Sequence, residues 1–231
     1  MPVVQDTVFD RHKNLHIHLI PALSNLLAAC RNPSSILADP SCKIVKQDHA
    51  TTVGRITISG VALAIKQYHL RNPGYAIKRS IRHSRAHNCW HMARKLIALG
   101  IATPPPVATI EERIGPFRRR SWFLSQWLEG EICSDFLLLN GLTEATRPAC
   151  LSVSNLLKLL HQHRIAHGDL KASNILLTPD GPALLDLDAA HSYRLHSPTW
   201  HYHQQRDQRR FLRNWQQHPE LLDYFSRQLI E

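Results

Sequence analysis

Short apolar runs alternate with polar turns over much of the first half of the chain, and this pattern predicts β-strands. The runs are rich in β-branched side chains and are bounded by glycine or by polar segments, as strands usually are. They are residues 42–47, 55–59, 61–68, 107–113 and 121–128. The first three predict antiparallel strands that turn at residues 48–54 and at Gly60, and the last two predict a hairpin around residues 114–117.

Apolar residues recur at helical spacing in several other stretches. These are residues 15–31, 77–99, 143–164, 206–217 and 220–229. Gly100 and the prolines at 104–106 end the second helix, because proline cannot continue it. The third is expected to be the long buried helix of the second half. The first is interpreted as a packing helix, and the alternative is an interfacial helix that lies on a membrane.

The strongest functional signal is the sequence HGDLKASN at residues 167–174. Phosphoryl transfer from ATP needs a carboxylate that orients the attacking hydroxyl and an amide oxygen that helps to hold the metal ion. Asp169 and Asn174 have the five-residue spacing that kinases use for these groups, with Gly168 in place of the usual arginine. Asp186 follows an apolar run, where kinases keep a second metal ligand. The alternative, a solvated turn between a helix and a strand, leaves the filling of both metal-ligand positions unexplained.

The sequences HGDLKASNILL and LLDLDAA resemble those of the lipopolysaccharide core kinases of the Kdo/WaaP group. The resemblance runs from about Cys42 to the C-terminus and is sharpest between His161 and Ala190. It implies an α+β, two-lobed, protein-kinase-like fold with an antiparallel-sheet N-lobe and a mainly helical, shortened C-lobe. The expected parts are an N-terminal helical extension at 1–41, an N-lobe at 42–128 and a C-lobe at 129–231, the two lobes forming one catalytic unit.

The resemblance places the nucleotide side of the site in the first half. The run that ends near Lys66 is similar to the kinase strand whose lysine reaches the nucleotide phosphates, and the alternative is a strand-end lysine that points into water. The preceding polar segment holds one glycine, so any cover over the phosphates is expected to use Thr51, Thr52 and the backbone near Gly54. By analogy of fold, adenine would meet the backbone at residues 126–128.

Lys66 lacks its usual partner in the sequence. Protein kinases pair this lysine with a glutamate on the next helix, but the helix predicted at 77–99 has no acidic residue. Glu111 or Glu112 is the candidate substitute, and the alternative is that phosphate alone holds the lysine.

The metal side is expected after the catalytic loop. Asn174 and Asp186 make an amide–carboxylate pair that suits Mg²⁺, which prefers a few hard oxygen ligands together with phosphate and water. Asp188 stands where the kinase motif has glycine, and it is expected either to bind a second metal ion or to cap the following turn.

Three residues of the loop have expected roles in the reaction. Asp169 is expected to accept the proton of the acceptor hydroxyl or to orient it. Lys171 is expected to balance charge on the γ-phosphate, and the alternative is a lysine that only faces solvent. His167 is expected to brace the loop through hydrogen bonds rather than to carry protons.

Composition adds a charge argument and excludes some classes of protein. The chain has 28 Lys and Arg against 18 Asp and Glu, a net charge of +10, so polyanions will attract it. The five cysteines are odd in number and form no C-x-x-C motif, which argues against a zinc site or a disulfide framework. The first ten residues do not read as a secretory signal, and no apolar run is long enough to span a bilayer. These features predict a protein of a reducing compartment, the cytoplasm.

Basic residues are concentrated between Asp48 and Glu111, where no acidic residue occurs. They are Arg55, Lys66, Arg71, Lys78, Arg79, Arg82, Arg85, Arg94 and Lys95. Together with the arginines at 118–120 they predict a surface for a phosphate-rich glycolipid or an anionic membrane, and the alternative is a solvated helix face. Arg79, Arg82 and Arg85 are the residues expected to bind the glycolipid.

The favoured function is that of an ATP- and Mg²⁺-dependent kinase that phosphorylates a heptose or Kdo hydroxyl of the lipopolysaccharide inner core. It would act as a peripheral protein at the inner face of the inner membrane. Residues 189–231 contain no A-P-E motif and are too few for a peptide platform, so a protein acceptor is not expected. The alternatives are a phosphotransferase for an aminoglycoside-like or choline-like alcohol and a degenerate kinase fold that only binds. A nucleic-acid partner is not expected, since net charge is its only support.

Overall fold

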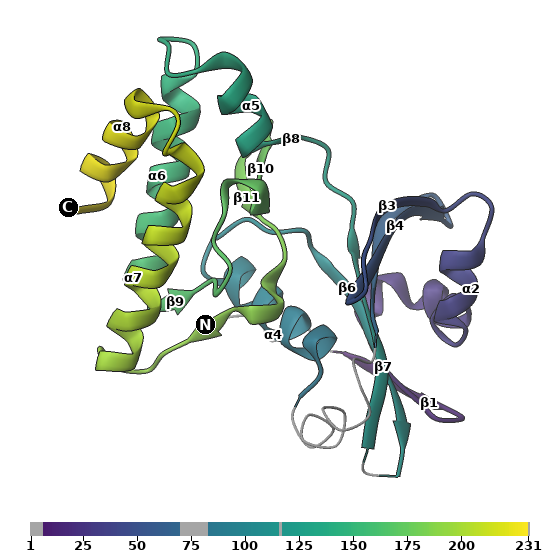
Figure 1. Ribbon diagram of the computed structural model, residues 1–231. Helices are drawn as coiled ribbons and strands as arrows, with labels where there is room; N and C mark the ends of the chain where they lie inside the picture. Colours follow the sequence, from purple (N-terminus) through teal and green to yellow (C-terminus); the bar gives the residue numbers. More distant parts are fainter. Residues whose placement is uncertain (1–6, 70–82, 116, 231) are drawn as a thin grey trace. The chain divides into compact units, whose positions relative to one another are not determined.

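The computed structural model describes residues 7–69, 83–115 and 117–230, and its chain forms two compact units (Figure 1). Unit 1 comprises Met1–Ala98 and Pro104–Trp127, and unit 2 comprises Leu99–Thr103 and Leu128–Glu231. None of the helices formed by the described residues is long and apolar enough to cross a membrane.

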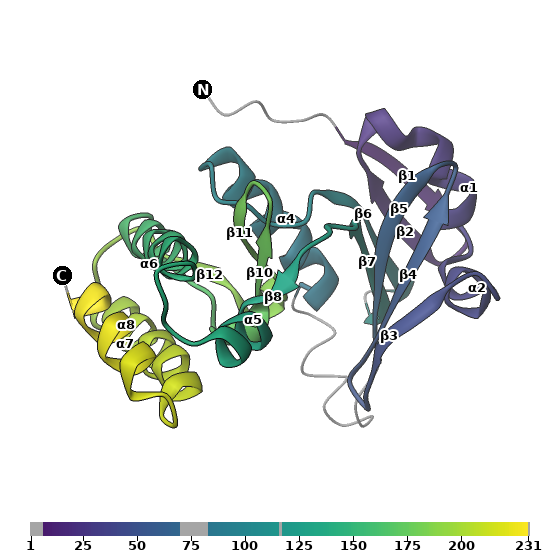
Figure 2. The same ribbon diagram turned by 90° about the horizontal axis from the view of Figure 1, so that it is seen from above.

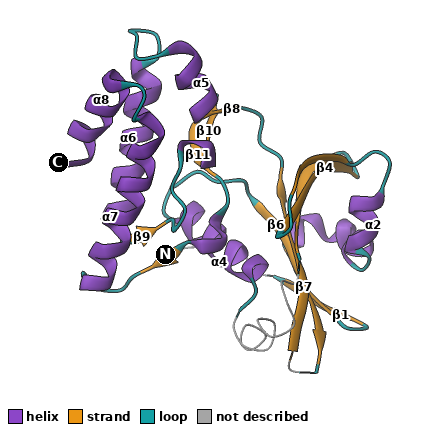
Figure 3. Ribbon diagram, viewed as in Figure 1, coloured by secondary structure: helices purple, strands orange, loops and turns teal. Residues whose placement is uncertain are grey.

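Unit 1 is built on an antiparallel sheet, whose strands are among the orange arrows of Figure 3. The sheet has seven strands in the order β1-β2-β6-β7-β5-β4-β3. The strands are β1 Val8–His12, β2 Leu15–Leu19, β3 Lys43–Gln47, β4 Thr51–Ile58, β5 Val61–Tyr68, β6 Pro106–Ile114 and β7 Phe117–Gln126. The strands predicted at 42–47, 55–59 and 61–68 and the hairpin around 114–117 are confirmed. The polar segment predicted at 48–54 is shorter than expected, because β4 already begins at Thr51.

The two faces of this sheet are covered by different helices (Figure 2). Alternate strand residues such as Ile17, Leu63 and Trp122 are buried in one core with the N-terminal helical segments. These segments are the 3₁₀ helix η1 Pro21–Leu26 and the α-helices α1 Leu27–Cys30 and α2 Pro33–Ala38. The helix α4 Arg85–Ala98 packs on the other face, where the Tyr68 hydroxyl lies 3.1 Å from Cys89 Sγ.

Two helix predictions in unit 1 need correction. The helix predicted at 15–31 is wrong over Leu15–Leu19, which forms β2, because its leucine and isoleucine residues alternate with histidine and the apolar side chains point to one face of the sheet. The helix predicted at 77–99 begins, within the described residues, only at Arg85. Ser84 accepts a hydrogen bond from His87 N and so caps this start. Residues 77–82 of the prediction lie outside the described residues.

Unit 2 is mainly helical. Its elements are β8 Glu131–Ile132, α5 Cys133–Asn140, α6 Arg147–Gln162, β9 Ile165–Ala166, η2 Ala172–Asn174, β10 Ile175–Thr178, β11 Gly181–Leu184, η3 Leu187–Ala189, β12 His191–Ser192, α7 Pro198–Leu212, η4 Arg213–Trp215 and α8 Pro219–Ile230. The three long helices α6, α7 and α8 lie side by side (Figures 1 and 2). Phe211, Trp215 and Phe225 stack between the last two, with ring centroids 5.0 to 5.8 Å apart.

The helices predicted in unit 2 are confirmed in place, with shifted ends. The buried helix predicted at 143–164 is α6, whose Val153, Leu157 and Leu160 are almost fully buried. The helix predicted at 206–217 starts earlier, at Pro198, where Ser197 accepts the Trp200 N–H as its N-cap.

Candidate active site

The residues of the HGDLKASN sequence form a tight turn that fixes Asp169 and Asn174 relative to each other. Asn174 N donates to the Lys171 carbonyl at 2.9 Å, which closes the 3₁₀ turn η2. The Asn174 side chain reaches back, and its Nδ2 donates to the Asp169 carbonyl at 2.8 Å. The five-residue spacing in the sequence is therefore the length of one hydrogen-bonded turn.

The turn is joined to the end of β11, where Asp186 lies. Leu185 N donates to the Asn174 carbonyl at 2.9 Å, which extends the β10–β11 hairpin by one residue pair. His167 Nε2 donates to the Leu185 carbonyl at 2.8 Å, and this hydrogen bond is consistent with the predicted role of His167 in bracing the loop. Asp186 follows with a left-handed backbone (φ 57°, ψ 61°), which few non-glycine residues adopt and which often marks functional sites.

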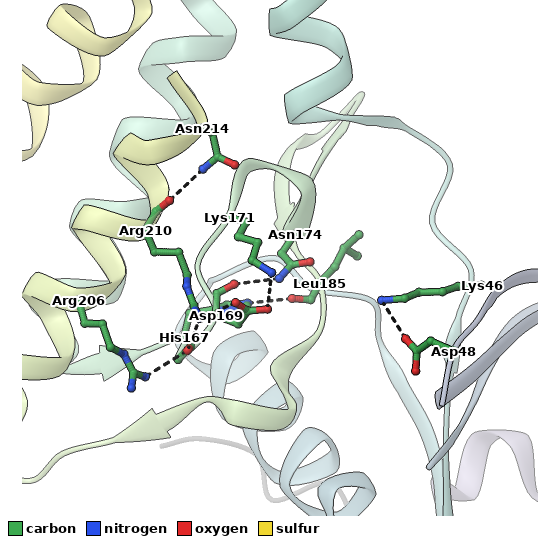
Figure 4. A network of polar contacts seen from close by, with 11 residues as sticks. Lys46, Asp48, His167, Asp169, Lys171, Asn174, Leu185, Arg206, Arg210 and Asn214 are labelled. Carbon is green, nitrogen blue, oxygen red and sulfur yellow. Dashed lines mark hydrogen bonds and ion pairs between the residues drawn. The ribbon is translucent and has the colours of Figure 1, made fainter. Parts of the chain in front are cut away.

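Two cations contact the Asp169 carboxylate (Figure 4). Lys171 Nζ lies 3.1 Å from Oδ2, and Arg210 Nη1 lies 2.5 Å from Oδ1. The three side chains remain accessible, with exposed fractions of 31% for Asp169, 45% for Lys171 and 41% for Arg210. A substrate can therefore reach the carboxylate and both cations.

Helix α7 holds the loop in place, and sequence reasoning missed this. Asp207 is buried, and its Oδ2 accepts the Gly168 N–H at 3.0 Å. The Gly168 carbonyl accepts hydrogen bonds from Arg206 Nη2 at 3.1 Å and from Arg210 Nη1 at 3.2 Å. The available signal was a single acidic residue inside the basic run RDQRR at 206–210.

Gly168, which stands where protein kinases have arginine, has no room for a side chain unless its neighbours shift. Its φ is +82°, and a Cβ atom would collide with the carbonyl oxygen of Ala189. The positive charge beside Asp169 comes from Lys171 of the loop and Arg210 of α7 instead.

The donors next to the loop fit Mg²⁺. The Nδ2 group of Asn174 is engaged by the Asp169 carbonyl, which leaves the amide oxygen for a cation. Asp186 directly follows Leu185, whose N–H donates to the Asn174 carbonyl, and Asp188 lies two residues later in η3. Among the described residues no group of three His, Cys, Asp or Glu is placed to hold a metal ion. Two carboxylates and an amide, completed by phosphate and water, form the kind of incomplete protein shell that Mg²⁺ accepts.

The predicted nucleotide residues lie in unit 1, and the structure separates them by face. Lys66 is opposite Val53 in β4, and its Nζ lies 5.1 Å from the ring centroid of Tyr68. Because side chains alternate along a strand, Thr51 shares the face of Lys66, whereas Thr52 and Gly54 belong to the opposite face.

Gly54 has a packing role. A Cβ atom at this position would lie 2.5 Å from Cys42 Sγ and 2.9 Å from Leu37 Cδ2, so the glycine lets β4 approach the N-terminal segments closely. The turn before β4 is closed by Asp48, which accepts the backbone N–H groups of Ala50 and Thr51, and these bonds hold its pKa at about 2. A phosphate-covering role for Thr51, Thr52 and Gly54 stays a prediction, and only Thr51 is on the face of Lys66.

Neither candidate glutamate is placed beside Lys66. Glu111 lies on β6, two strands away from Lys66, and Glu112 belongs to the other face. Both carboxylates are bound by arginines: Arg113 and Arg118 contact Glu111, and Arg120 contacts Glu112. These contacts do not support a pairing of either glutamate with Lys66, and the substitute for the missing helix glutamate stays a prediction.

Glu111 is nevertheless ionised although it is only 3% exposed. Burial opposes its charge, but hydrogen bonds from Ser84 and Arg113 outweigh burial and lower its pKa to about 2. This carboxylate therefore fixes the start of α4 to the sheet.

Of the three arginines expected to bind the glycolipid, the structure describes one. Arg79 and Arg82 lie outside the described residues. Arg85 begins α4, and its guanidinium carbon lies 4.7 Å from the Tyr68 ring centroid.

Comparison with known proteins places the fold and the family of the chain. A solved structure described as WaaP in complex with acyl carrier protein has a TM-score of 0.60 and 18% sequence identity, and the similarity covers 93% of this chain and 98% of that one. The kinase-like α+β fold expected from the sequence is thus confirmed.

A curated relative matches only in part. The EKC/KEOPS complex subunit BUD32 of Debaryomyces hansenii is 33% identical over 73 residues, which are 32% of this chain and 24% of that protein. The match thus spans about a quarter of the relative's length. Residues 42–220 match a family described as lipopolysaccharide kinase (Kdo/WaaP), and because this is most of the sequence, the chain belongs to that family of kinases.

Proposed function

We propose that this protein transfers the γ-phosphoryl group of ATP to a heptose or Kdo hydroxyl of the lipopolysaccharide inner core. The observation that carries the proposal is the hydrogen-bonded unit of Asp169, Asn174 and the β11 end, in a chain of this kinase family. Phosphoryl transfer depends mainly on alignment and on neutralising charge, and this unit offers groups for both.

Each residue of the loop has a proposed task. Asp169 binds the acceptor hydroxyl and takes its proton as the bond to phosphorus forms. Lys171 stands 3.1 Å from this carboxylate and can balance charge on the transferred phosphoryl group. Lys66 is assigned to the other phosphates of the nucleotide by its place in β5.

Asn174, Asp186 and Asp188 are the residues that would hold Mg²⁺. The ion, when bound, neutralises phosphate charge and aligns the leaving group. The Asn174 hydrogen bond to the Asp169 carbonyl keeps the metal side and the acceptor side of the loop at a fixed separation. The left-handed backbone at Asp186 turns the chain into η3, which contains Asp188.

The charge around the loop argues against the alternative functions. Lys171, Arg206 and Arg210 surround the catalytic turn, and such a lining would repel an aminoglycoside-like or choline-like cation. A purely binding role would not require Asp169, Asn174 and Asp186 together. We therefore retain the anionic glycolipid as acceptor and the cytoplasmic face of the inner membrane as the proposed place of action. Because the similar WaaP structure contains an acyl carrier protein, we propose such a carrier as a second partner to be tested.

The test is phosphoryl transfer by the purified full chain. Lipid A carrying Kdo alone, or Kdo and heptose, is incubated with ATP and Mg²⁺, and the product is identified by mass spectrometry. We expect one added phosphate on a core sugar with the natural chain and none with Asp169→Asn. A folded, ATP-binding protein that phosphorylates no inner-core acceptor would rule the function out.

A further inference from the structure

Three basic side chains lie around Asp169 and the adjacent Gly168. Lys171 and Arg210 both contact Asp169, and Arg206 contacts the adjacent Gly168 carbonyl. The next carboxylate, Asp207, is buried and accepts the Gly168 N–H. Three cations therefore lie around Asp169 and Gly168, beside the proposed position of the acceptor hydroxyl, whereas Asp186 and Asp188 are assigned to the metal ion.

Arg210 has hydrogen-bonding groups to spare. A guanidinium carries five N–H donors. In the structure of the described residues, Nη1 is bonded to Asp169 Oδ1 and to the Gly168 carbonyl, and no hydrogen bond of Nε or Nη2 is found. The side chain is 41% exposed, so these N–H groups can meet a ligand from solvent. A planar fork of this kind matches the two oxygens of a carboxylate or phosphate.

Arg206 supports the same site from one helical turn away. Residues four apart lie on one face of a helix, so Arg206 and Arg210 present their guanidinium groups side by side (Figure 4). Arg206 Nη2 is bonded to the Gly168 carbonyl, and its buried Nε has no hydrogen-bond partner among the described residues. Both arginines are fixed by the backbone of the catalytic loop, so their geometry is set before any ligand arrives.

We propose that Arg210, with Arg206 beside it, binds an anionic group of the acceptor sugar that is adjacent to the hydroxyl to be phosphorylated. This inference rests on the proposed function and names the chemistry of its acceptor: a carboxylate, as in an ulosonic acid, or a phosphate already on the core. One guanidinium would hold both the catalytic carboxylate and the acceptor anion. That arrangement selects the hydroxyl next to the anion, because a general base acts only on a proton within hydrogen-bond reach.

The natural chain alone allows a first test. Its kcat/KM is measured for Kdo-bearing lipid A and for the methyl ester of the same carboxyl group, and for a heptose-bearing core with and without its phosphate. In one of the two pairs, we expect kcat/KM for the charged acceptor to exceed that for its neutral form by at least about tenfold. The pair that shows this preference identifies the anion that Arg210 binds. If the chain phosphorylates these acceptors with no preference in either pair, the inference is overturned while the kinase function stands. If it phosphorylates none of them, the function itself fails.

Variants then assign the preference to Arg210. Arg210→Gln is expected to raise KM for the charged acceptor by at least about tenfold more than it raises KM for the neutral form. Arg210→Lys keeps the charge but loses the fork, and it is expected to restore only part of the preference. Arg209→Gln is the matched control, since Arg209 is exposed on the same helix and its side chain, in the part of the chain that the structure describes, bonds to the Gln205 carbonyl and not to the catalytic loop. Equal changes in KM for both forms of the acceptor would mean that Arg210 only supports the loop.

Discussion

Gly168 combines a φ of +82° with a position where a Cβ atom would meet the Ala189 carbonyl. We expect Gly168→Ala to lower the free energy of unfolding by about 2 kcal/mol or more, because it adds a steric collision to the cost of a left-handed alanine. Urea denaturation measures the change. Gly60→Ala is the matched control: Gly60 has a φ of +79° with nothing within 4 Å of the added atom, so it isolates the cost of the backbone angle. Equal losses in the two variants would show that the collision is relieved.

Asp169 is the residue on which the proposed chemistry depends. Asp169→Asn keeps the size of the side chain and its place in the turn but removes the charge that accepts a proton. We expect a folded protein whose kcat is about 10² to 10⁴ times lower, the range usual for a lost general base. Steady-state kinetics and a thermal melt of the same sample check both parts. Near-full turnover by a folded variant would remove Asp169 from the mechanism.

Asp186 lies closer along the chain to the residue bonded to Asn174 than Asp188 does. Asp186 comes directly after the residue paired to Asn174, whereas Asp188 lies within η3. We expect Asp186→Ala to abolish Mg²⁺-dependent ATP binding and Asp188→Ala to weaken it less. Calorimetry with ATP, in the presence of Mg²⁺ or of a chelator, measures the difference. Complete loss in both variants would make Asp188 an essential ligand as well.

At the scale of elements, the sequence predicted best where one periodicity covers a whole strand or helix. The β4–β5 hairpin and α6 have such patterns, and the catalytic turn is local, so five residues of spacing were enough to place Asp169 and Asn174 together. The strand β2 was missed because its five alternating residues run directly into helical segments. The number of apolar residues over the whole stretch 15–31 is also typical of a helix.

The contacts of α7 with the catalytic loop had no comparable local signal. Arg210 and Asp169 are 41 residues apart, and their pairing follows from the packing of α7 within unit 2. Gly54 shows a related limit: a glycine that admits close packing and a glycine that exposes backbone amides look alike in a sequence. Both cases depend on which elements become neighbours, and spacing alone does not encode that.

A row of histidines on α4 and just before it predicts acid sensitivity. His83, His87 and His91 follow one face of α4, with ring centroids 4.3 and 4.2 Å apart. Burial, and then the charge of His91, lower the pKa of His87 from 6.5 to about 4. Burial also lowers the pKa values of His91 and of His18 on β2, although the Glu111 charge opposes this at His18. The lowered pKa values keep His18, His87 and His91 neutral in the folded protein at neutral pH.

A lowered histidine pKa means that the unfolded chain binds protons more readily than the folded one. The stability contributed by His87 is therefore present above its unfolded pKa of 6.5 and is lost as the pH falls toward about 4. Because His87 is only partly buried, we expect a loss of about 1 kcal/mol rather than the full value of the shift. Urea midpoints at about pH 7.5 and pH 5 measure it, and His87→Gln should reduce the difference. An equal difference in the variant would place the acid sensitivity elsewhere.

At the scale of the whole molecule, the net charge of +10 exceeds what a nucleotide site uses. Not all of it is available to a partner: Arg113, Arg118 and Arg120 are bound to Glu111 and Glu112 at the β6–β7 hairpin. Arg119 is exposed between them. Basic residues near an anionic bilayer contribute about 1 kcal/mol each, and the contribution decays within a Debye length of about 10 Å at 0.1 M salt.

We therefore predict salt-sensitive binding to vesicles that contain anionic lipid, measured by co-sedimentation at low and high salt. The triple variant Arg79→Gln, Arg82→Gln and Arg85→Gln should raise KM for an acceptor held in such vesicles and leave KM for ATP unchanged. Arg227→Gln, in which the lost cation belongs to an exposed pair with Asp223, is the control. A soluble acceptor separates this membrane effect from recognition of the sugar. KM for a soluble acceptor should be unchanged in the triple variant and raised in Arg210→Gln. If the triple variant binds vesicles as well as the natural chain at low salt, these arginines form only a solvated surface, and the attraction to the membrane must come from another part of the chain.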